Sequence, residues 1–257
     1  MTSGLVACDI DGTLLRTGHP VSSAVREAAA AVRGAGNHLV LATGRSLAGA
    51  LPVAEQLGLR DTWVVASNGA VTARLTRGGF EVIERHDLDA ETAVRAAVAT
   101  APGIRISAEI VGVGYRVNIP FPDEKLNGTQ HSILELQDLW ARPTPRLSLH
   151  GSAVFRVVPT LRALGLTAIA TRGDWVDATA PGISKATALE KVRSELGVED
   201  YNTVAIGDDE NDLGMLMWAA RSFAMGHAPA LVVAAADHLA GTVDQDGAAA
   251  ALHSLLS

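Results

Sequence analysis

The sequence contains a single cysteine, Cys8, among its 257 residues. One thiol cannot form a disulfide within the chain and has no second thiol with which to share a metal ion. A secreted disulfide scaffold and a zinc-ribbon protein are therefore both excluded. A reducing compartment fits best, and we expect a cytoplasmic location. Alternation along an extended segment directs Cys8 away from the acidic residue that follows it, so we expect Cys8 in the core.

Runs of basic residues and long apolar segments are also absent. The formal net charge is −7, from 21 Lys and Arg against 28 Asp and Glu, which argues against the basic surface that nucleic-acid binding needs. No apolar stretch approaches the roughly 18 residues of a membrane-spanning helix, and the first residues lack the basic segment of a signal peptide. We therefore expect neither a nucleic-acid partner nor a membrane partner.

What the chain does contain is an alternation of short apolar runs and helical patterns, which is typical of parallel strands joined by crossover helices. The first expected strands are Leu5–Cys8, His38–Ala42 and Trp63–Ala66. Ser22 and Ser23 are suited to cap a helix between the first two strands. Pro52 conflicts with the next helical pattern, and we expect it to start or kink that helix.

This pattern is interrupted and then returns. A β-hairpin of Val71–Leu75 and Phe80–Ile83 is followed by a helix at about 89–99 and by a proline-rich stretch with short strand candidates. The α/β pattern resumes near Ser184. These features predict an α/β fold with a doubly wound, mostly parallel sheet. Residues 1–84 and 182–257 form its core domain, and residues 85–181 form an inserted α+β domain.

Polar side chains follow four of the expected core strands. They occupy segments 9–13, 43–45, 67–69 and 207–212. Because ligands bind beyond the carboxyl ends of parallel strands, we expect these segments to converge on one acidic pocket.

Asp9 and Asp11 lie two positions apart on an extended segment, which places both carboxylates on the same side and within about 7 Å of each other. Asp208 adds a third negative charge. Repulsion among them would raise a carboxylate pKa unless a cation is bound. An oxygen-rich site without a histidine or thiolate cluster selects a hard ion, and Mg²⁺ accepts one or two carboxylates together with waters and substrate phosphate. We therefore expect Mg²⁺ as the cofactor.

Lys185 follows Ser184 in the first turn of an expected helix, where a cation opposes the helix dipole by about 0.3–1 kcal/mol. Two interpretations are open from this residue alone. It is either a solvated lysine or part of an anion site shared with the free amides of the helix N-terminus. Thr43 as a hydroxyl donor and the predicted magnesium pocket favour a phosphate site.

Four segments in this order resemble the motifs of haloacid dehalogenase superfamily phosphatases, specifically the class IIB or Cof-type group. They are DIDGT at 9–13, TGR at 43–45, Lys185, and GDDEND at 207–212. The resemblance covers nearly the whole chain, including SNGA at 67–70 and PGISK at 181–185. It implies a haloacid dehalogenase-like core of Rossmann type, with residues 85–181 as a cap of the C2B type.

The resemblance also implies a role for each site residue. Asp9 is the expected nucleophile, which forms an aspartyl-phosphate, and Asp11 is the expected general acid and base. The expected Mg²⁺ ligands are Asp9, the backbone carbonyl of Asp11, and Asp208. The groups expected to hold the phosphoryl oxygens are the Ile10 amide, Thr43, Gly44, Lys185 and Asn211. Asp212 is expected to orient these groups or to pair with Lys185.

Several residues are left with two interpretations. His227 stands where the family usually has an asparagine, and it either alters a contact behind the metal ligands or is a satisfied structural histidine. Arg45 either contacts substrate or pairs with surface acids. Four arginines of the inserted domain are candidate substrate contacts or ordinary surface residues: Arg105, Arg116, Arg142 and Arg156.

The function implied by the resemblance is Mg²⁺-dependent hydrolysis of small phosphorylated metabolites, with sugar phosphates as the first expectation. The cap is expected to exclude water and to limit substrate size. We expect a monomer or a weak homo-oligomer. Two alternatives are a phosphomutase of the phosphomannomutase type and a non-enzymatic phospho-receiver or binding module. The large insertion and the intact Asp11 count against the second alternative.

Overall fold

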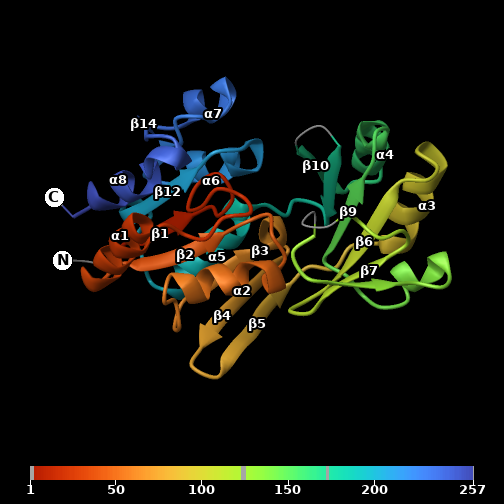
Figure 1. The fold of residues 1–257 in the computed structure, drawn as a ribbon, viewed down its shortest axis with the longest axis horizontal. Coiled ribbons are helices and arrows are strands. Elements are labelled where there is room, and N and C mark those ends of the chain that lie inside the picture. Colours follow the sequence, from red (N-terminus) through yellow and green to blue (C-terminus); the bar gives the residue numbers. More distant parts are fainter. Residues whose placement is uncertain (1–2, 123–125, 172–173, 257) are drawn as a thin grey trace.

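The computed structural model describes residues 3–122, 126–171 and 174–256. Figure 1 shows two halves side by side, each built around its own sheet. The chain enters the second half after its first five strands and returns from it before α5. The α/β fold class predicted from the sequence is confirmed, whereas the domain boundaries at residues 84/85 and 181/182 stay predictions. In the described part of the chain, no helix has the length and apolar character needed to cross a bilayer.

The larger sheet has eight strands in the order β14-β13-β12-β1-β2-β3-β4-β5. Neighbouring strands from β14 to β3 pair in parallel, and β4 and β5 extend the sheet as an antiparallel hairpin. The strands are β1 (Leu5–Cys8), β2 (His38–Ala42), β3 (Trp63–Ala66), β4 (Val71–Thr76), β5 (Gly79–Arg85), β12 (Thr203–Gly207), β13 (Arg221–Ala224) and β14 (His238–Leu239).

Helices pack on both faces of this sheet, as a doubly wound fold requires. Val6 and Cys8 of β1 pack on one face with α1 (Ser23–Gly34), α2 (Leu47–Gln56) and α8 (Gly247–His253). Leu5 and Ala7 pack on the other face with α5 (Lys185–Glu195), α6 (Leu213–Trp218) and α7 (Ala230–Ala235). The period-2 alternation of β1 therefore divides its side chains between two cores, and it places Cys8 in one of them as expected.

Side-chain caps start the first two helices. The Ser22 hydroxyl accepts a hydrogen bond from Val25 N at 3.1 Å, and the Ser46 hydroxyl accepts one from Gly49 N at 3.3 Å. Pro52 lies inside α2 and not at its start, so that part of the expectation is wrong. Ser46 caps the helix six residues before Pro52, so the proline lies in the helix interior, where it contributes no backbone N–H.

The second sheet has six strands in the order β10-β11-β9-β6-β7-β8, all antiparallel except for the β7–β8 pair. They are β6 (Arg105–Ile110), β7 (Gly114–Val117), β8 (Thr129–Ser132), β9 (Arg146–His150), β10 (Thr167–Thr171) and β11 (Trp175–Thr179). Its apolar face packs against α3 (Ala90–Thr100) and α4 (Val157–Ala163). This sheet and its two helices are called the cap below, and the rest of the molecule is called the core.

Short 3₁₀ segments complete the described elements. They are η1 (Ser67–Gly69), η2 (Leu136–Leu139), η3 (Val154–Arg156), η4 (Asp200–Asn202), η5 (Glu210–Asp212) and η6 (Val243–Gln245). Two of them follow core strands, η1 after β3 and η5 after β12. They therefore turn the chain at the carboxyl ends of these strands, where the polar motifs lie.

Candidate active site

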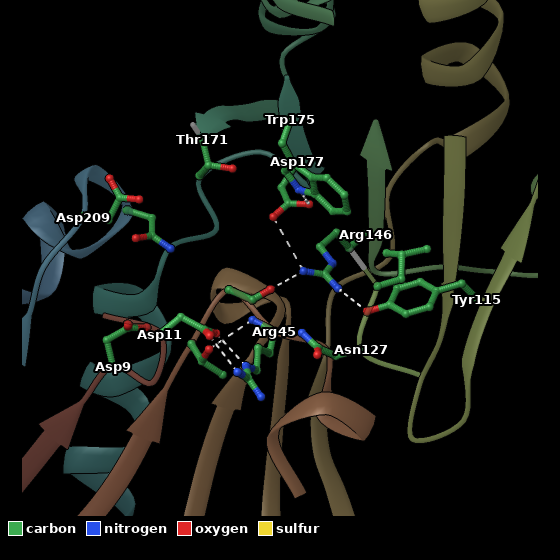
Figure 2. Close-up of a pocket in the computed structure, with 14 residues that line it drawn as sticks. Asp9, Asp11, Arg45, Tyr115, Asn127, Arg146, Thr171, Trp175, Asp177 and Asp209 are labelled. Atoms are coloured by element: carbon green, nitrogen blue, oxygen red, sulfur yellow. Dashed lines mark hydrogen bonds and ion pairs between the residues drawn. The ribbon is translucent and has the colours of Figure 1, made fainter. Parts of the chain in front are cut away.

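The carboxyl ends of the central core strands open into a cavity of about 200 Å³ between the core and the cap. Figure 2 shows residues of both halves around it. The core contributes the loops after β1, β2 and β12 to the cavity lining, and the cap contributes side chains of β7, β9 and β11. Three of the four sequence motifs therefore line one cavity beneath the cap, and the fourth, Lys185, contacts Asp9.

Lys185 lies at the centre of the acidic cluster. Its Nζ donates hydrogen bonds to Asp9 Oδ1 and Asp212 Oδ1, each at 2.6 Å, and all three residues are buried. Burial lowers the pKa of Lys185, but the charges of Asp212 and Asp9 outweigh this effect and hold the pKa above its usual value. Lys185 therefore stays charged, and it pairs with Asp212 in the way the sequence suggested.

Asp212 also organises the loop after β12. Its Oδ2 accepts hydrogen bonds from the backbone N–H groups of Asp208 and Asp209, at 2.9 and 3.1 Å. Asp208 in turn accepts a hydrogen bond from the Thr13 hydroxyl at 3.0 Å. The carboxylate of Asp208 is thus fixed next to the loop after β1.

Oxygen atoms of Asp9, Asp208 and Asp212 lie within 4.8 Å of one another. Burial raises the pKa of Asp9 well above its usual value, and burial followed by the charge of Asp212 raises the pKa of Asp208 to about 7. One lysine does not offset three buried carboxylates, so the ionised cluster has room for another cation. Both oxygens of Asp212 already accept hydrogen bonds, which leaves Asp9 and Asp208 as the better direct ligands. A donor set of carboxylate oxygens fits a hard divalent ion.

Gly12 allows the loop after β1 to approach this cluster closely. Its φ is +86°, and a Cβ atom on Gly12 would lie 2.2 Å from Asp208 Oδ2. A side chain at this position would therefore displace the Asp208 carboxylate. Glycine is required here both for the left-handed backbone and for the space.

Asp11 points away from the carboxylate cluster toward Arg45. Arg45 donates from Nε to Asp11 Oδ2 and from Nη2 to Asp11 Oδ1, each at 2.6 Å (Figure 2). The Thr17 hydroxyl donates to Asp11 Oδ1 at 2.9 Å. Arg45 and Asp11 both line the cavity. Of the two interpretations of Arg45, the structure therefore shows pairing with an acid, but the acid belongs to the site and not to the outer surface.

The predicted phosphate-binding residues of the core lie close together. Thr43 is buried at the end of β2, where its hydroxyl accepts a hydrogen bond from Arg45 N at 3.0 Å. A Cβ on Gly44 would lie 3.2–3.3 Å from side-chain atoms of Asn68 and Asn211, so these loops touch one another. The carbonyl of Ile10 accepts hydrogen bonds from the turn that follows β1.

Asn68 is a site residue to which the sequence analysis gave no role. Its Oδ1 accepts a hydrogen bond from Asn211 Nδ2 at 2.9 Å, and its Nδ2 donates to Asp177 Oδ2 at 3.4 Å. Asn68 has φ +56° in η1. The signal for it was present, because an Asn-Gly pair one residue after a buried strand favours this left-handed turn.

Arg146 is the cation that the cap contributes to the cavity lining in the described part of the chain, and the sequence analysis missed it. The four arginines proposed from the sequence do not line the cavity. Two of them donate to backbone carbonyls of the cap instead: Arg105 to Pro120, and Arg116 to Leu139 and Arg142. On β9, polar Arg146, Ser148 and His150 alternate with Leu147 and Leu149. This period of two was the available signal that one face of β9 is polar.

His227 combines its two proposed roles. Its Nε2 lies 3.5 Å from Asp208 Oδ2, and its Nδ1 accepts a hydrogen bond from Val243 N at 3.4 Å. The side chain therefore contacts a carboxylate of the cluster while being held by the backbone of η6.

The fold and the site together are those of an α/β enzyme with an acidic pocket beneath a cap. The sequence matches the model of the haloacid dehalogenase-like hydrolases over residues 6–116 and 159–252. The chain belongs to this family, which confirms the resemblance, and it is an enzyme of the family's phosphatase type.

Individual relatives extend over almost the whole chain. The chain is 28% identical to the 5-amino-6-(5-phospho-D-ribitylamino)uracil phosphatase YcsE of Bacillus subtilis, over 96% of this chain and 94% of that protein. It is 29% identical to a phosphoglycolate phosphatase of Natronomonas pharaonis, over 94% of this chain and 93% of that protein. The solved structure of BT1666 from Bacteroides thetaiotaomicron, described among phosphatases of the haloalkanoate (HAD) enzyme superfamily, has a TM-score of 0.82 at 27% identity. The two structures match over 98% of this chain and 95% of the BT1666 chain.

Proposed function

We propose that this chain is a Mg²⁺-dependent phosphatase that hydrolyses small phosphorylated metabolites through an aspartyl-phosphate on Asp9. The observation that carries the proposal is the position of Lys185, whose Nζ joins Asp9 to Asp212 at 2.6 Å on each side. A buried nucleophilic carboxylate needs a fixed cation to remain ionised, and Lys185 supplies one.

In this proposal the chain uses its two first-strand aspartates for different tasks. The Asp9 carboxylate attacks phosphorus, and the bond from phosphorus to the leaving oxygen breaks. Asp11 gives a proton to that oxygen and then takes a proton from the water that hydrolyses the aspartyl-phosphate. Arg45 holds the Asp11 carboxylate in one orientation through its two hydrogen bonds.

The remaining motif residues hold the phosphoryl group and the metal. The phosphoryl oxygens are bound by the Ile10 amide, Thr43, Gly44, Lys185 and Asn211. The residues that would hold Mg²⁺ are Asp9, the backbone carbonyl of Asp11, and Asp208, with Asp212 fixing their surroundings. Mg²⁺, when bound, neutralises the buried carboxylates and the charge on the phosphoryl oxygens.

The covered cavity supports a small substrate. A cavity of about 200 Å³ beneath the cap suits a metabolite and not a folded phosphoprotein, and two relatives are named for small phosphate monoesters. Sugar phosphates are our first expectation. We further propose residues 85–181 as the cap domain, a monomer or weak homo-oligomer in solution, and a cytoplasmic location.

The test is phosphate release from a panel of small monoesters with Mg²⁺, and again after chelation. We expect turnover that chelation abolishes and Mg²⁺ restores. Asp9→Asn removes the nucleophile at similar volume and should abolish turnover, whereas Asp61→Asn, at an exposed surface carboxylate, should not. Activity on a phosphoprotein alone would contradict the proposal. Conversion of a hexose 1-phosphate into its 6-phosphate instead of free sugar would support the mutase alternative.

A further inference from the structure

The cap wall of the cavity carries a buried cluster of three charged residues, Arg146, Glu109 and Asp177. They come from the adjacent strands β9, β6 and β11. Their exposed fractions are 3%, 1% and 6%. Arg146 and Asp177 line the cavity, and Glu109 reaches Arg146 from outside this lining. Under the proposed function the core motifs bind the phosphoryl group, which leaves the cap side of the cavity, where this cluster lies, for the leaving group of the substrate.

Arg146 is committed to protein partners. Its Nη2 donates to Tyr115 Oη at 3.0 Å, and its Nη1 donates to the carbonyl of Gly44. Its Nη1 lies 3.6 Å from Asp177 Oδ2 (Figure 2). Its Nε lies 3.2 Å from Glu109 Oε2. The guanidinium therefore donates to two protein oxygens, and the carboxylates of Glu109 and Asp177 offset its charge, so little of that charge is available to an acidic ligand.

The two carboxylates outnumber the guanidinium. Burial raises the pKa of Glu109, although Arg146 and a hydrogen bond from Ser67 oppose this effect. With Glu109 ionised the cluster carries a net negative charge, and with Glu109 protonated it is neutral. In neither state does it present a net positive charge, so a carboxylate or second phosphate on the leaving group finds no compensating cation in this cluster.

Asp177 is held in place from several sides. Its Oδ1 accepts hydrogen bonds from Ser148 Oγ at 2.7 Å and from Trp175 Nε1 at 3.1 Å. The Trp175 ring itself lies against Phe121 and His150, with centroids 5.5 and 5.9 Å away. The cap thus offers a fixed carboxylate, which accepts hydrogen bonds from hydroxyl groups, next to a fixed aromatic surface against which a carbon skeleton packs.

We propose that the leaving-group end of this cavity selects uncharged, hydroxyl-bearing leaving groups and rejects those that carry a carboxylate or a second phosphate, with Asp177 and Glu109 as the specificity-determining residues. This inference rests on the proposed function. Two relatives are named for substrates of the two kinds. The ribityl phosphate has a hydroxyl-bearing leaving group, and we expect this chain to accept substrates of that kind. Phosphoglycolate has an acidic leaving group, and we expect this chain to reject it.

The first experiment compares two substrates that differ at one carbon. Glycerol 3-phosphate carries a hydroxymethyl group where 3-phosphoglycerate carries a carboxylate, and sorbitol 6-phosphate and 6-phosphogluconate form a second such pair. We expect kcat/KM to be at least about tenfold higher for the neutral member of a pair. Equal values, a preference for the acidic member, or no turnover of either pair while p-nitrophenyl phosphate is hydrolysed would overturn the inference alone. Failure to hydrolyse p-nitrophenyl phosphate with Mg²⁺ would overturn the proposed function as well.

The second experiment removes one negative charge at a time. Asp177→Asn should reduce the neutral-to-acidic ratio of kcat/KM by at least about threefold, and Glu109→Gln should reduce it in the same direction without changing the cavity lining. Glu91→Gln is the matched control, since it removes the same charge from an exposed position on α3 of the cap, and it should leave the ratio unchanged. A ratio that Asp177→Asn does not change would contradict the assignment of these residues.

Discussion

Arg45 and Asp11 are joined by two parallel hydrogen bonds, each 2.6 Å long, between loops that follow neighbouring strands. A guanidinium bound in this way fixes both the position and the plane of the carboxylate. Arg45 directly follows Thr43 and Gly44. The loop proposed to bind the phosphoryl group therefore also holds the proposed acid and base at a set place beside it.

We expect Arg45→Met to lower kcat by about 10- to 100-fold, because Asp11 loses the contact that fixes its carboxylate beside the loop proposed to bind the phosphoryl group. Arg45→Lys keeps the charge but cannot form both hydrogen bonds, so it should show most of the same loss. Steady-state kinetics on one alkyl phosphate will measure both variants. A kcat within twofold of the parent for Arg45→Met would refute the orienting role.

Lys185→Met should destabilise the protein by about 3–5 kcal/mol at neutral pH, since it leaves Asp9 and Asp212 buried without their shared cation. Lys191 forms an ion pair with Glu84 on the surface. Lys191→Met is the control, and it should cost no more than about 1 kcal/mol. Urea unfolding of the metal-free proteins gives the free energy of unfolding of each variant. Equal decreases in the two variants would contradict a larger contribution from the buried ion pairs of Lys185 than from the surface pair of Lys191.

Gly12→Ala should abolish turnover, because its Cβ would occupy the place of the Asp208 carboxylate. Gly18 provides a matched control. It also has positive φ, +81° against +86° for Gly12, but nothing lies within 4 Å of where its Cβ would be. Both substitutions incur a backbone strain of about 1–2 kcal/mol, whereas only Gly12→Ala disturbs the site. We expect Gly18→Ala to keep the parental kcat, and a parallel loss in both variants would implicate strain alone.

Glu109 predicts a pH dependence of stability. Burial raises the pKa of Glu109 in the folded protein, so the folded state binds this proton more tightly than the unfolded chain does. The resulting stabilisation is fully present below the pKa that Glu109 has in the unfolded chain. That contribution is lost as pH rises through the folded pKa. Glu109→Gln removes this titration, and the variant should lose less stability than the parent between about pH 5 and about pH 8. Urea unfolding at both pH values provides the comparison. An equal or larger loss in the variant would reverse the sign we assign.

The core was predictable because its signals are local. Strands β1, β2 and β3 have the bounds expected from their apolar runs, and Lys185 lies in the first turn of α5 as expected, directly after the capping residue Ser184. Each motif of the core with a proposed catalytic role directly follows such a strand or opens such a helix. A parallel sheet then brings these ends together without further information.

The missed elements have weaker local patterns. Strands β8, β10 and β14 are all at sheet edges, where one side of the strand is unpaired and the apolar alternation is poor. Helix α4 contains Pro159 and lies in the proline-rich stretch where we expected short strands, but this proline is in the first turn, where no N–H is required. Helix α7 has only six residues, which are too few to show a helical period in the sequence.

The cap side of the site could not be predicted for a different reason. Arg146 meets Glu109 and Asp177 only because β9 pairs with β6 on one side and β11 on the other. That strand order depends on contacts distant in sequence, and nothing within β9 itself indicates its neighbours. The alternation of polar and apolar residues identifies the polar face of β9 but not the half of the molecule that this face meets.

The most direct test of the account is a search for a phosphoryl group on Asp9. The Asp11→Asn variant should form the aspartyl-phosphate slowly from p-nitrophenyl phosphate and Mg²⁺, because this leaving group needs no proton, and then hydrolyse it poorly. Mass spectrometry of the rapidly quenched variant should show one added phosphoryl group on the peptide containing Asp9, which Asp9→Asn lacks. A variant that turns over at the parental rate, or a phosphoryl group found on another residue, would contradict the account.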